Sequence, residues 1–179
     1  MSKVINLFAP SGSGKSTGAA YIFSMLKMNG ISCELIQEFA KDKVWENNTE
    51  IFKPENQVYI FGKQFYRMSR LKDKVDYIIT DSPLLLSNVY NKSEFLKPHF
   101  EDAVRDCFNS FENLDWFIER VKPFDPKGRN EKSVEESDAY AEKIISELKK
   151  VNSQFLRTTG DQEGYDKIVK EILVLEGKL

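Results

Sequence analysis

The stretch Ala9 to Thr17 (APSGSGKST) decides the fold of this chain. It follows a short apolar run, Val4 to Ala9 (VINLFA), which predicts a buried strand. After it comes an amphipathic pattern that ends at Asn29-Gly30, a typical helix stop. A strand, a glycine-rich turn and a helix therefore follow one another directly, and the turn is the segment that can carry chemistry.

This turn closely fits the Walker A pattern G-x-x-x-x-G-K-[ST], with alanine in the first glycine position. Gly12 and Gly14 allow consecutive backbone N–H groups to converge on phosphates at a helix N-terminus. Lys15 is expected to reach the β- and γ-phosphates of a nucleoside triphosphate, and the Ser16 hydroxyl to ligate Mg²⁺. ATP and Mg²⁺ are thus the expected cofactors. The residues expected to bind the nucleotide are Ser11, Gly12, Ser13, Gly14, Lys15, Ser16 and Thr17.

The composition is that of a globular chain and argues against several classes of protein. The 179 residues suit one domain spanning 1–179. A net charge of -2 argues against non-specific DNA binding. Two distant cysteines and a single histidine, His99, argue against a zinc site and a Ser/His/Asp triad. No apolar run reaches roughly 18 residues, so we expect no membrane span and a cytoplasmic location.

Apolar runs and amphipathic patterns alternate along the rest of the chain. Residues 41–52 are polar and predict no regular structure, and Pro54 is well placed to open a long helix. The alternation predicts a parallel sheet covered on both faces, a three-layer α/β/α fold. The further strands are expected at Cys33 to Ile36, Val75 to Thr80, Leu114 to Ile118 and Phe155 to Thr158.

Two carboxylates are expected at the strand ends where such a sheet meets its nucleotide. Asp81 follows the strand that ends at Thr80, and can hold Mg²⁺ or accept the proton of an attacking hydroxyl. Glu38 follows the second strand and can act as a general base or a magnesium ligand. The alternatives are a strand-end Asp that only caps the next segment and a Glu that faces solvent.

The helix after Pro54 offers candidate contacts to an acceptor. Gln64 can hydrogen-bond a base edge in two directions, and Arg67 lies one helical turn further on. Phe65 beside them fits the buried stripe of the helix, so core packing is the alternative for this region.

The polar stretch Glu119 to Asn130 (ERVKPFDPKGRN) predicts a lid over about 120–133. Its Arg120 and Arg129 can form forked hydrogen bonds with phosphate oxygens and stabilise charge during phosphoryl transfer. An ordinary solvated loop is the alternative. Ser133 to Glu136 matches a capping box and predicts the start of the next helix.

With these motifs, nearly the whole chain resembles the P-loop nucleoside and nucleotide kinases in its order of elements. The resemblance implies a five-stranded parallel sheet in the order 2-3-1-4-5, with Lys15 and Ser16 as the family's Walker A pair. It implies Arg120 and Arg129 as lid arginines.

The stretches Thr80 to Pro83 and Lys122 to Asn130 look most like phage and bacterial kinase-like ATPases related to ribosylnicotinamide kinases. Some phage relatives are similar to kinases of 5-hydroxymethyluracil, as a nucleotide or within DNA. Glu38 with Trp45 weakly resembles deoxynucleoside kinases, but their Glu-Arg-Ser motif is replaced here by Asp81-Ser82-Pro83.

The expected function is an ATP- and Mg²⁺-dependent kinase acting on a nucleoside or nucleotide acceptor, as a monomer or homodimer. A kinase of 5-hydroxymethyluracil in DNA is the runner-up, disfavoured by the net charge. A basic groove would favour it, assembled from Lys92, Lys97, Lys122, Lys127 and Arg129. A nucleotide-dependent ATPase switch is the third hypothesis; Asn91 to Glu94 (NKSE) lacks the aspartate of the guanine-specific Asn-Lys-x-Asp motif.

Overall fold

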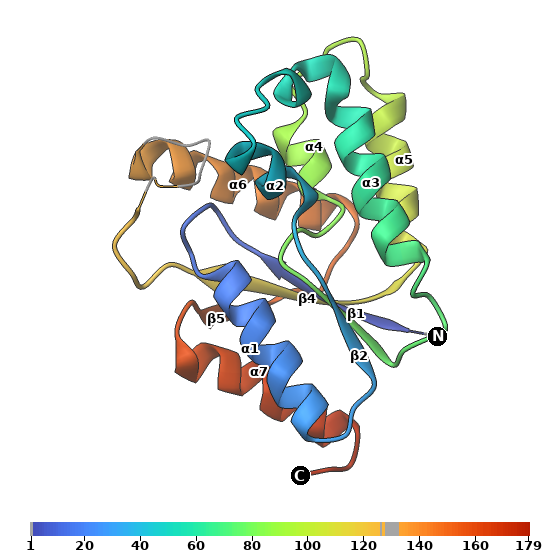
Figure 1. Ribbon diagram of the computed structural model, residues 1–179, viewed down its shortest axis with the longest axis vertical. Coiled ribbons are helices and arrows are strands. Elements are labelled where there is room, and N and C mark those ends of the chain that lie inside the picture. Colours follow the sequence, from blue (N-terminus) through green and yellow to red (C-terminus); the bar gives the residue numbers. More distant parts are fainter. Residues whose placement is uncertain (1, 126, 128–132) are drawn as a thin grey trace.

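The computed structural model describes residues 2–125, 127 and 133–179. Their strands form a parallel sheet in the order β2-β3-β1-β4-β5, which confirms the expected topology (Figure 1). The strands are β1 (Lys3–Phe8), β2 (Cys33–Ile36), β3 (Tyr77–Thr80), β4 (Glu112–Glu119) and β5 (Leu156–Thr159).

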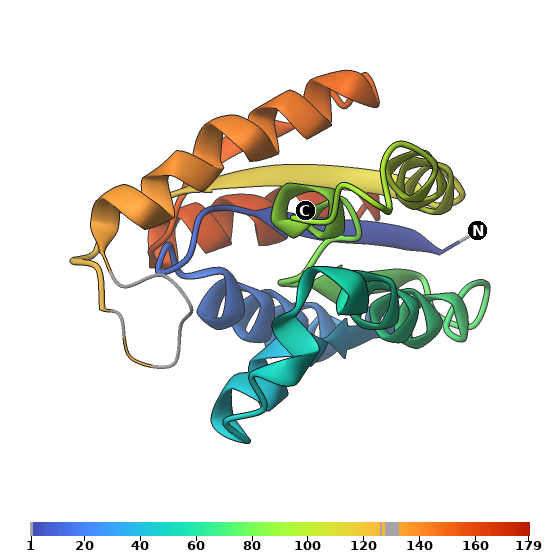
Figure 2. The same ribbon diagram turned by 90° about the horizontal axis from the view of Figure 1, so that it is seen from above.

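Helices cover both faces of this sheet, and β1 at its centre shows why. The side chains of β1 alternate, so that Ile5 and Leu7 pack with α1 and α7, whereas Val4 and Phe8 pack with α3, α5 and α6. Accordingly, α1 and α6 lie on opposite sides of the β1–β4 pair (Figure 2). The α-helices are α1 (Lys15–Met28), α2 (Phe39–Trp45), α3 (Gln57–Ser69), α4 (Leu86–Tyr90), α5 (His99–Asn109), α6 (Val134–Lys150) and α7 (Gln162–Leu175).

The segment between β2 and α3 differs from the expectation of irregular structure over 41–52. It contains helix α2 and two short 3₁₀ helices, η1 (Glu50–Phe52) and η2 (Pro54–Asn56). Only Phe39 of α2 is buried, so the helix carries no repeating apolar pattern that its sequence could reveal. Pro54 opens η2, with α3 following at once, close to the predicted helix start.

A polar cluster lies within the sheet between β1 and β4. Asn6 is fully buried in β1 and pairs in register with Asp115. Its side-chain amide donates hydrogen bonds of 2.9 Å to both Asp115 and Asn113. Asp115 also accepts a 2.5 Å hydrogen bond from Ser153. Burial raises the pKa of Asp115, although the hydrogen bonds from Ser153 and Asn6 act in the opposite direction.

A second polar group, which we call the α5–α6 charge cluster, joins the helices on one face of the sheet. Arg105 donates hydrogen bonds of 3.2 Å to both carboxylate oxygens of Glu147, which is 6% exposed. Asn88 donates to the same carboxylate at 3.1 Å. The remaining members of the cluster are Glu101, Asp102 and Lys150. Each charge in this cluster therefore has an opposite charge beside it.

None of the helices in the described parts of the chain combines the length and apolar character needed to cross a membrane.

Candidate functional site

The turn between β1 and α1 has the conformation that a phosphate-binding loop needs. Gly12 and Gly14 have φ angles of 80° and 94°, in the left-handed region that glycine tolerates. Gly14 is the N-cap of α1, and no side chain of the described residues caps that helix. By contrast, Ser133 and Asp161 cap α6 and α7 through their side chains. The N–H groups in the first turn of α1 are thus left for an anion.

Helix α7 and the turn after β5 pack against this loop and support it. The Tyr165 hydroxyl donates a 3.0 Å hydrogen bond to the carbonyl of Gly14, and a Cβ on Gly14 would lie only 2.3 Å from that hydroxyl. A Cβ on Gly160 would lie 2.0 Å from the carbonyl oxygen of Ser13. Burial raises the pKa of Tyr165, so its hydroxyl keeps its proton and remains a donor. The close fit fixes the loop before any ligand binds.

Some side chains of the loop are exposed, and others are buried beneath it. Lys15 donates hydrogen bonds to the carbonyls of Ala9 (2.8 Å) and Pro10 (3.3 Å), which folds it back over the loop. Ser16 and Thr17 are exposed on the first turn of α1. Ser13 is buried beneath, and its hydroxyl has no hydrogen-bond partner among the described residues.

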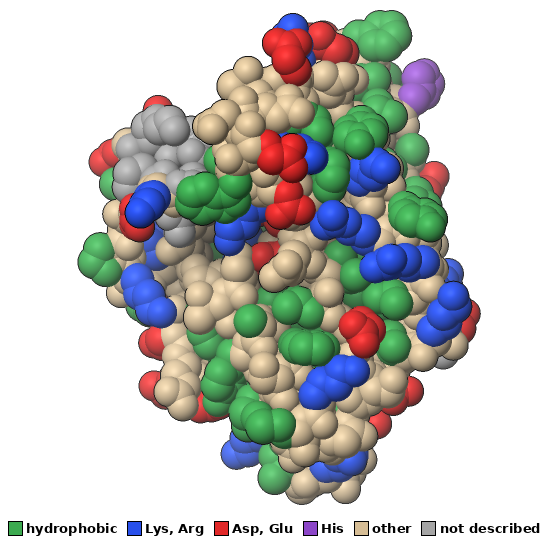
Figure 3. Space-filling view, in the orientation of Figure 1, with side chains coloured by type: hydrophobic (Ala, Val, Ile, Leu, Met, Phe, Trp, Pro, Cys, Tyr) green, Lys and Arg blue, Asp and Glu red, His purple; other side chains and the backbone are tan. Residues whose placement is uncertain are grey.

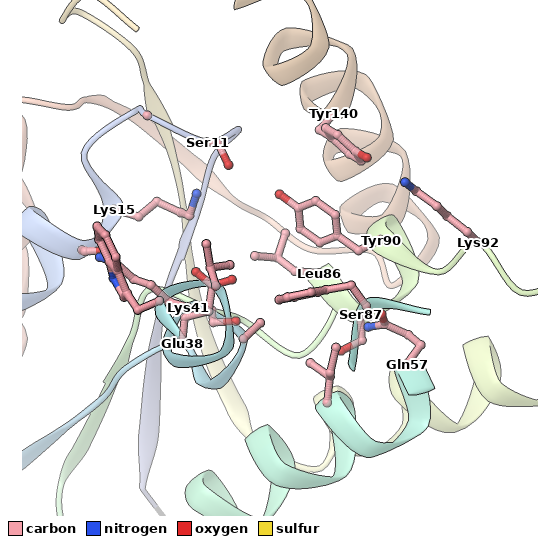
Figure 4. Close-up of a pocket in the computed structure, with 18 of the residues that line it drawn as sticks. Ser11, Lys15, Glu38, Lys41, Gln57, Leu86, Ser87, Tyr90, Lys92 and Tyr140 are labelled. Carbon is pink, nitrogen blue, oxygen red and sulfur yellow. The ribbon is translucent and has the colours of Figure 1, made fainter. Parts of the chain in front are cut away.

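A cavity of about 430 Å³ opens beside the loop and is seen as a hollow in the space-filling view (Figure 3). Every predicted nucleotide-binding residue except the buried Ser13 lines it. The rest of the lining comes from α2, η1, the start of α3, and α4, with Tyr140 of α6, and Figure 4 shows Tyr90 and Tyr140 across the cavity from Lys15. This volume is within the range of small-molecule sites.

The structure brings Glu38 and Asp81 together at the cavity edge of the sheet. Strand β2 ends at Ile36, and Glu38 is the N-cap residue of α2 and lines the cavity. Asp81 directly follows β3, is 3% exposed, and accepts a 3.0 Å hydrogen bond from the backbone N–H of Glu38. Asp81 thereby positions the backbone that carries Glu38.

Gln64 and Arg67 are placed differently from the acceptor contacts that we expected. Gln64 is buried; its carbonyl oxygen accepts from the N–H of Phe39 (3.3 Å), and its NH₂ group donates to Thr80 and to the Ser82 carbonyl. Arg67 donates to the Gln37 carbonyl and lies over the ring of Phe39. Neither belongs to the described lining of the cavity, because the face of α3 that carries them packs against the start of α2. Gln57 and Ile60 of the same helix line it instead.

The predicted lid is described only in part, and Arg129 lies outside the described residues. Arg120 donates to the hydroxyl of Ser137 (3.2 Å) and pairs with Asp138. Ser137 in turn donates to the Ser11 carbonyl at 2.7 Å. Arg120 therefore connects the start of α6 to the phosphate-binding loop. As the capping box predicts, the Ser133 hydroxyl accepts from the Glu136 N–H at 3.2 Å.

Several residues of the cavity were not identified from the sequence. Tyr90 of α4 and Tyr140 of α6 form a ring pair with centroids 4.8 Å apart. They are fifty positions apart, so the sequence pattern contains no signal that joins them. Lys41 and Ser87 were missed because they lie on α2 and α4, and no helix was predicted from the sequence in either place.

No protein-family model matches this chain, and no curated protein sequence matches it. Among solved structures, it is similar to NadR protein in complex with NAD and AMP-PNP, with a TM-score of 0.71 and 15% identity. It is equally similar to NadR protein in complex with NR, with a TM-score of 0.71 and 16% identity. The matches cover 97% of this chain but only 49% and 50% of those chains, so it spans about half their length. The likeness shows that this chain has the parallel α/β fold of these proteins, as its P-loop kinase order of elements predicted.

Proposed function

We propose that this chain is a kinase that transfers the γ-phosphoryl group of ATP, with Mg²⁺, to a nucleoside or nucleotide acceptor. One observation carries the proposal: the uncapped N-terminus of α1 and the Glu38 carboxylate belong to the same cavity, whose far wall is aromatic. A site for the phosphate donor, a base and room for an acceptor that carries a ring thus belong to one cavity.

The donor end is built to hold a triphosphate. The N-terminus of α1, which no described side chain caps, and the positive end of the α1 dipole attract phosphate oxygens. Lys15 is folded over the same loop, where its ammonium can neutralise charge on the transferring phosphoryl group. The oxygen-bearing side chains of Ser16 and Asp81 suit a hard cation. Bound Mg²⁺ would neutralise charge on the β- and γ-phosphates there.

We assign the base role to Glu38 and a positioning role to Asp81. Glu38 lines the cavity, whereas Asp81 is buried behind it with one carboxylate oxygen bonded to the Glu38 N–H. Glu38 would accept the proton of an attacking hydroxyl. An acceptor that attacks through a phosphate oxygen needs no base, and both carboxylates would then serve the metal.

Arg120 and Arg129 complete the proposal as arginines of the lid. Arg120 already connects α6 to the Ser11 carbonyl through Ser137, so it can couple closure of this region to the phosphate-binding loop. Arg129 would approach the transferring group, where a guanidinium stabilises developing charge.

The proposal is tested by incubating the protein with γ-labelled ATP and Mg²⁺ against a panel of acceptors. The panel contains nucleosides, nucleoside monophosphates, ribosylnicotinamide and DNA with 5-hydroxymethyluracil. Label on a free nucleoside or monophosphate supports the small-molecule kinase and names its acceptor. Label on DNA alone moves the function to a DNA kinase. Slow hydrolysis that no acceptor accelerates contradicts transfer and favours an ATPase switch.

DNA remains the second candidate acceptor because of one observation. Lys41, Lys92 and Lys127 all line the cavity, and lysines of this kind also bind the phosphates of a nucleic acid strand.

A further inference from the structure

The cavity is basic although the chain is not. The protein has a net charge of -2, yet the described residues that line the cavity include four lysines and one glutamate. Lys15 belongs to the phosphate-binding loop, so the triphosphate accounts for that charge. The other lysines come from α2, from the segment after α4 and from the predicted lid region. Positive charge therefore surrounds more of the cavity than the donor phosphates occupy.

Two of these lysines lack the partners that nearby lysines have. Within the described residues, neither Lys41 nor Lys92 forms a hydrogen bond or an ion pair. Close to each in the sequence, Lys43 pairs with Glu46 at 2.7 Å and Lys97 pairs with Glu94 at 3.4 Å. The paired lysines do not belong to the cavity lining, and the unpaired ones do.

Lys92 lies beside the aromatic wall of the cavity. Figure 4 shows it on the same side as Tyr90 and Tyr140, with Lys15 and Ser11 on the other side. An ammonium on that side is poorly placed for the donor triphosphate and well placed for a charge on the acceptor. An aromatic wall favours a ring, and a nearby ammonium favours an anion attached to that ring.

We propose that the acceptor carries a phosphate of its own, bound by Lys92, so that the substrate is a nucleotide unit rather than an uncharged nucleoside. This inference rests on the proposed kinase function. Because Lys92 lies away from the donor site, the attacking group is a hydroxyl of that nucleotide. A bond forms between the hydroxyl oxygen and Pγ, the Pγ–O bond to the β-phosphate breaks, ADP leaves, and the proton passes to Glu38.

The chain contains its own reporter for acceptor binding. Trp45 lines the cavity and is 60% exposed, whereas Trp116, the other tryptophan, is 2% exposed in the core. A ring that enters the cavity should change the fluorescence of Trp45, and a Trp45→Phe variant shows which part of the signal comes from it. The protein is first saturated with AMP-PNP and Mg²⁺, so that later titrations report on the acceptor end.

Matched nucleosides, their monophosphates and a short single-stranded oligonucleotide are then titrated. We expect a monophosphate or the oligonucleotide to bind about tenfold or more tightly than the nucleoside, as a charge-assisted contact predicts. In Lys92→Gln that preference should fall to about twofold, and Lys41→Gln should reduce it less. Lys97→Gln and Lys43→Gln are the controls. Both should prefer the phosphorylated form over the nucleoside as strongly as the unmodified protein does.

The results separate this inference from the proposed function. If AMP-PNP does not bind, the kinase proposal itself fails. If AMP-PNP binds but nucleoside and phosphorylated forms bind equally, or Lys92→Gln keeps the full preference, this inference is overturned. Tighter binding of the monophosphate supports a free nucleotide as the source of the phosphate, and tighter binding of the oligonucleotide supports a strand.

Discussion

The α5–α6 charge cluster and the cavity are two charged regions that differ in whether their charged groups have partners. In the cluster, Glu147 is nearly buried and receives hydrogen bonds from Arg105, Asn88 and Lys150. In the cavity, Lys41 and Lys92 have no such partner among the described residues, and the N-terminus of α1 has no side-chain cap. The cluster satisfies its own charges, whereas the described part of the cavity leaves two lysines and the N-terminus of α1 available to a ligand.

The contrast separates stability from function. Removing one member of a buried, fully paired group leaves another member uncompensated and destabilises the fold. Removing an unpaired lysine from an open cavity leaves no group behind that depends on it. Substitutions in the cluster should therefore change the free energy of unfolding, and substitutions in the cavity should change binding and turnover.

The largest expected effect is on the cavity side. We expect Lys15→Ala to reduce phosphoryl transfer by about 10³-fold or more, because the ammonium stabilises charge that develops on the transferring group. Labelled-ATP transfer measures the loss, and a thermal melt should show an intact fold. Near-normal turnover in this variant would contradict the assignment of the phosphate-binding loop.

On the cluster side, Glu147→Gln should lower the free energy of unfolding by about 3 kcal/mol, because Arg105 loses its buried counter-charge. Turnover below the melting temperature should stay within about twofold. The matched control is Asp102→Asn, which removes an exposed partner of Arg105 and should cost less than about 1 kcal/mol. Urea unfolding measures both, and equal losses would mean that burial does not distinguish the two pairs.

The same cluster predicts a dependence of stability on pH. Burial alone would raise the pKa of Glu147, but hydrogen bonds from Lys150, Arg105 and Asn88 outweigh it and hold the pKa below its usual value. Its contribution is therefore present above about pH 4.5 and is lost as the pH falls through the lower folded-state pKa. The stability difference between the unmodified protein and Glu147→Gln should shrink as urea unfolding is repeated from pH 6 to below pH 4. A constant difference would contradict the lowered pKa.

The smallest expected effect concerns a residue that serves both stability and function. Tyr165→Phe removes the hydrogen bond to the Gly14 carbonyl and keeps the packing under the loop. We expect a loss of about 1 kcal/mol in unfolding free energy and a rise of a few-fold in the KM for ATP. Unfolding and kinetics on the same preparation test this. A change in neither quantity would show that packing alone positions the loop.

The sheet could be predicted because its signals are local. Each strand is a short apolar run and the phosphate-binding turn has a fixed spacing, so the strands and the loop follow from neighbouring residues. The strand order was expected only from the resemblance to the P-loop nucleoside and nucleotide kinases. Helices α2 and α4 could not, because α2 buries only Phe39 and α4 has five residues, too few to show a helical period.

In the candidate site, the sequence indicated the residues of a single turn and the two carboxylates that follow strands, Glu38 and Asp81, but not the contacts that depend on how helices pack. The glycines and Lys15 act within a single turn, but the direction of Gln64 depends on α2, which was not predicted. The pairing of Tyr90 with Tyr140 depends on how α4 packs on α6. Likewise, Lys43 and Lys41 look alike in the sequence, and only the structure separates the paired lysine from the unpaired one.

The buried Asn6 has a consequence for how the chain folds. Parallel strands made of interchangeable apolar residues can slide by two positions and still bury the same faces. In β1, such a slide toward the carboxyl end of β4 would set Asn6 opposite Phe117 and bring Asp115 to the position that Asn113 holds now. The side-chain amide of Asn6 would then lose one of its two hydrogen bonds in the core. Asn6 therefore makes this misregistered pairing less favourable than the native register. It thereby helps to keep the end of β1, where the phosphate-binding loop begins, in its native position beside the neighbouring strands.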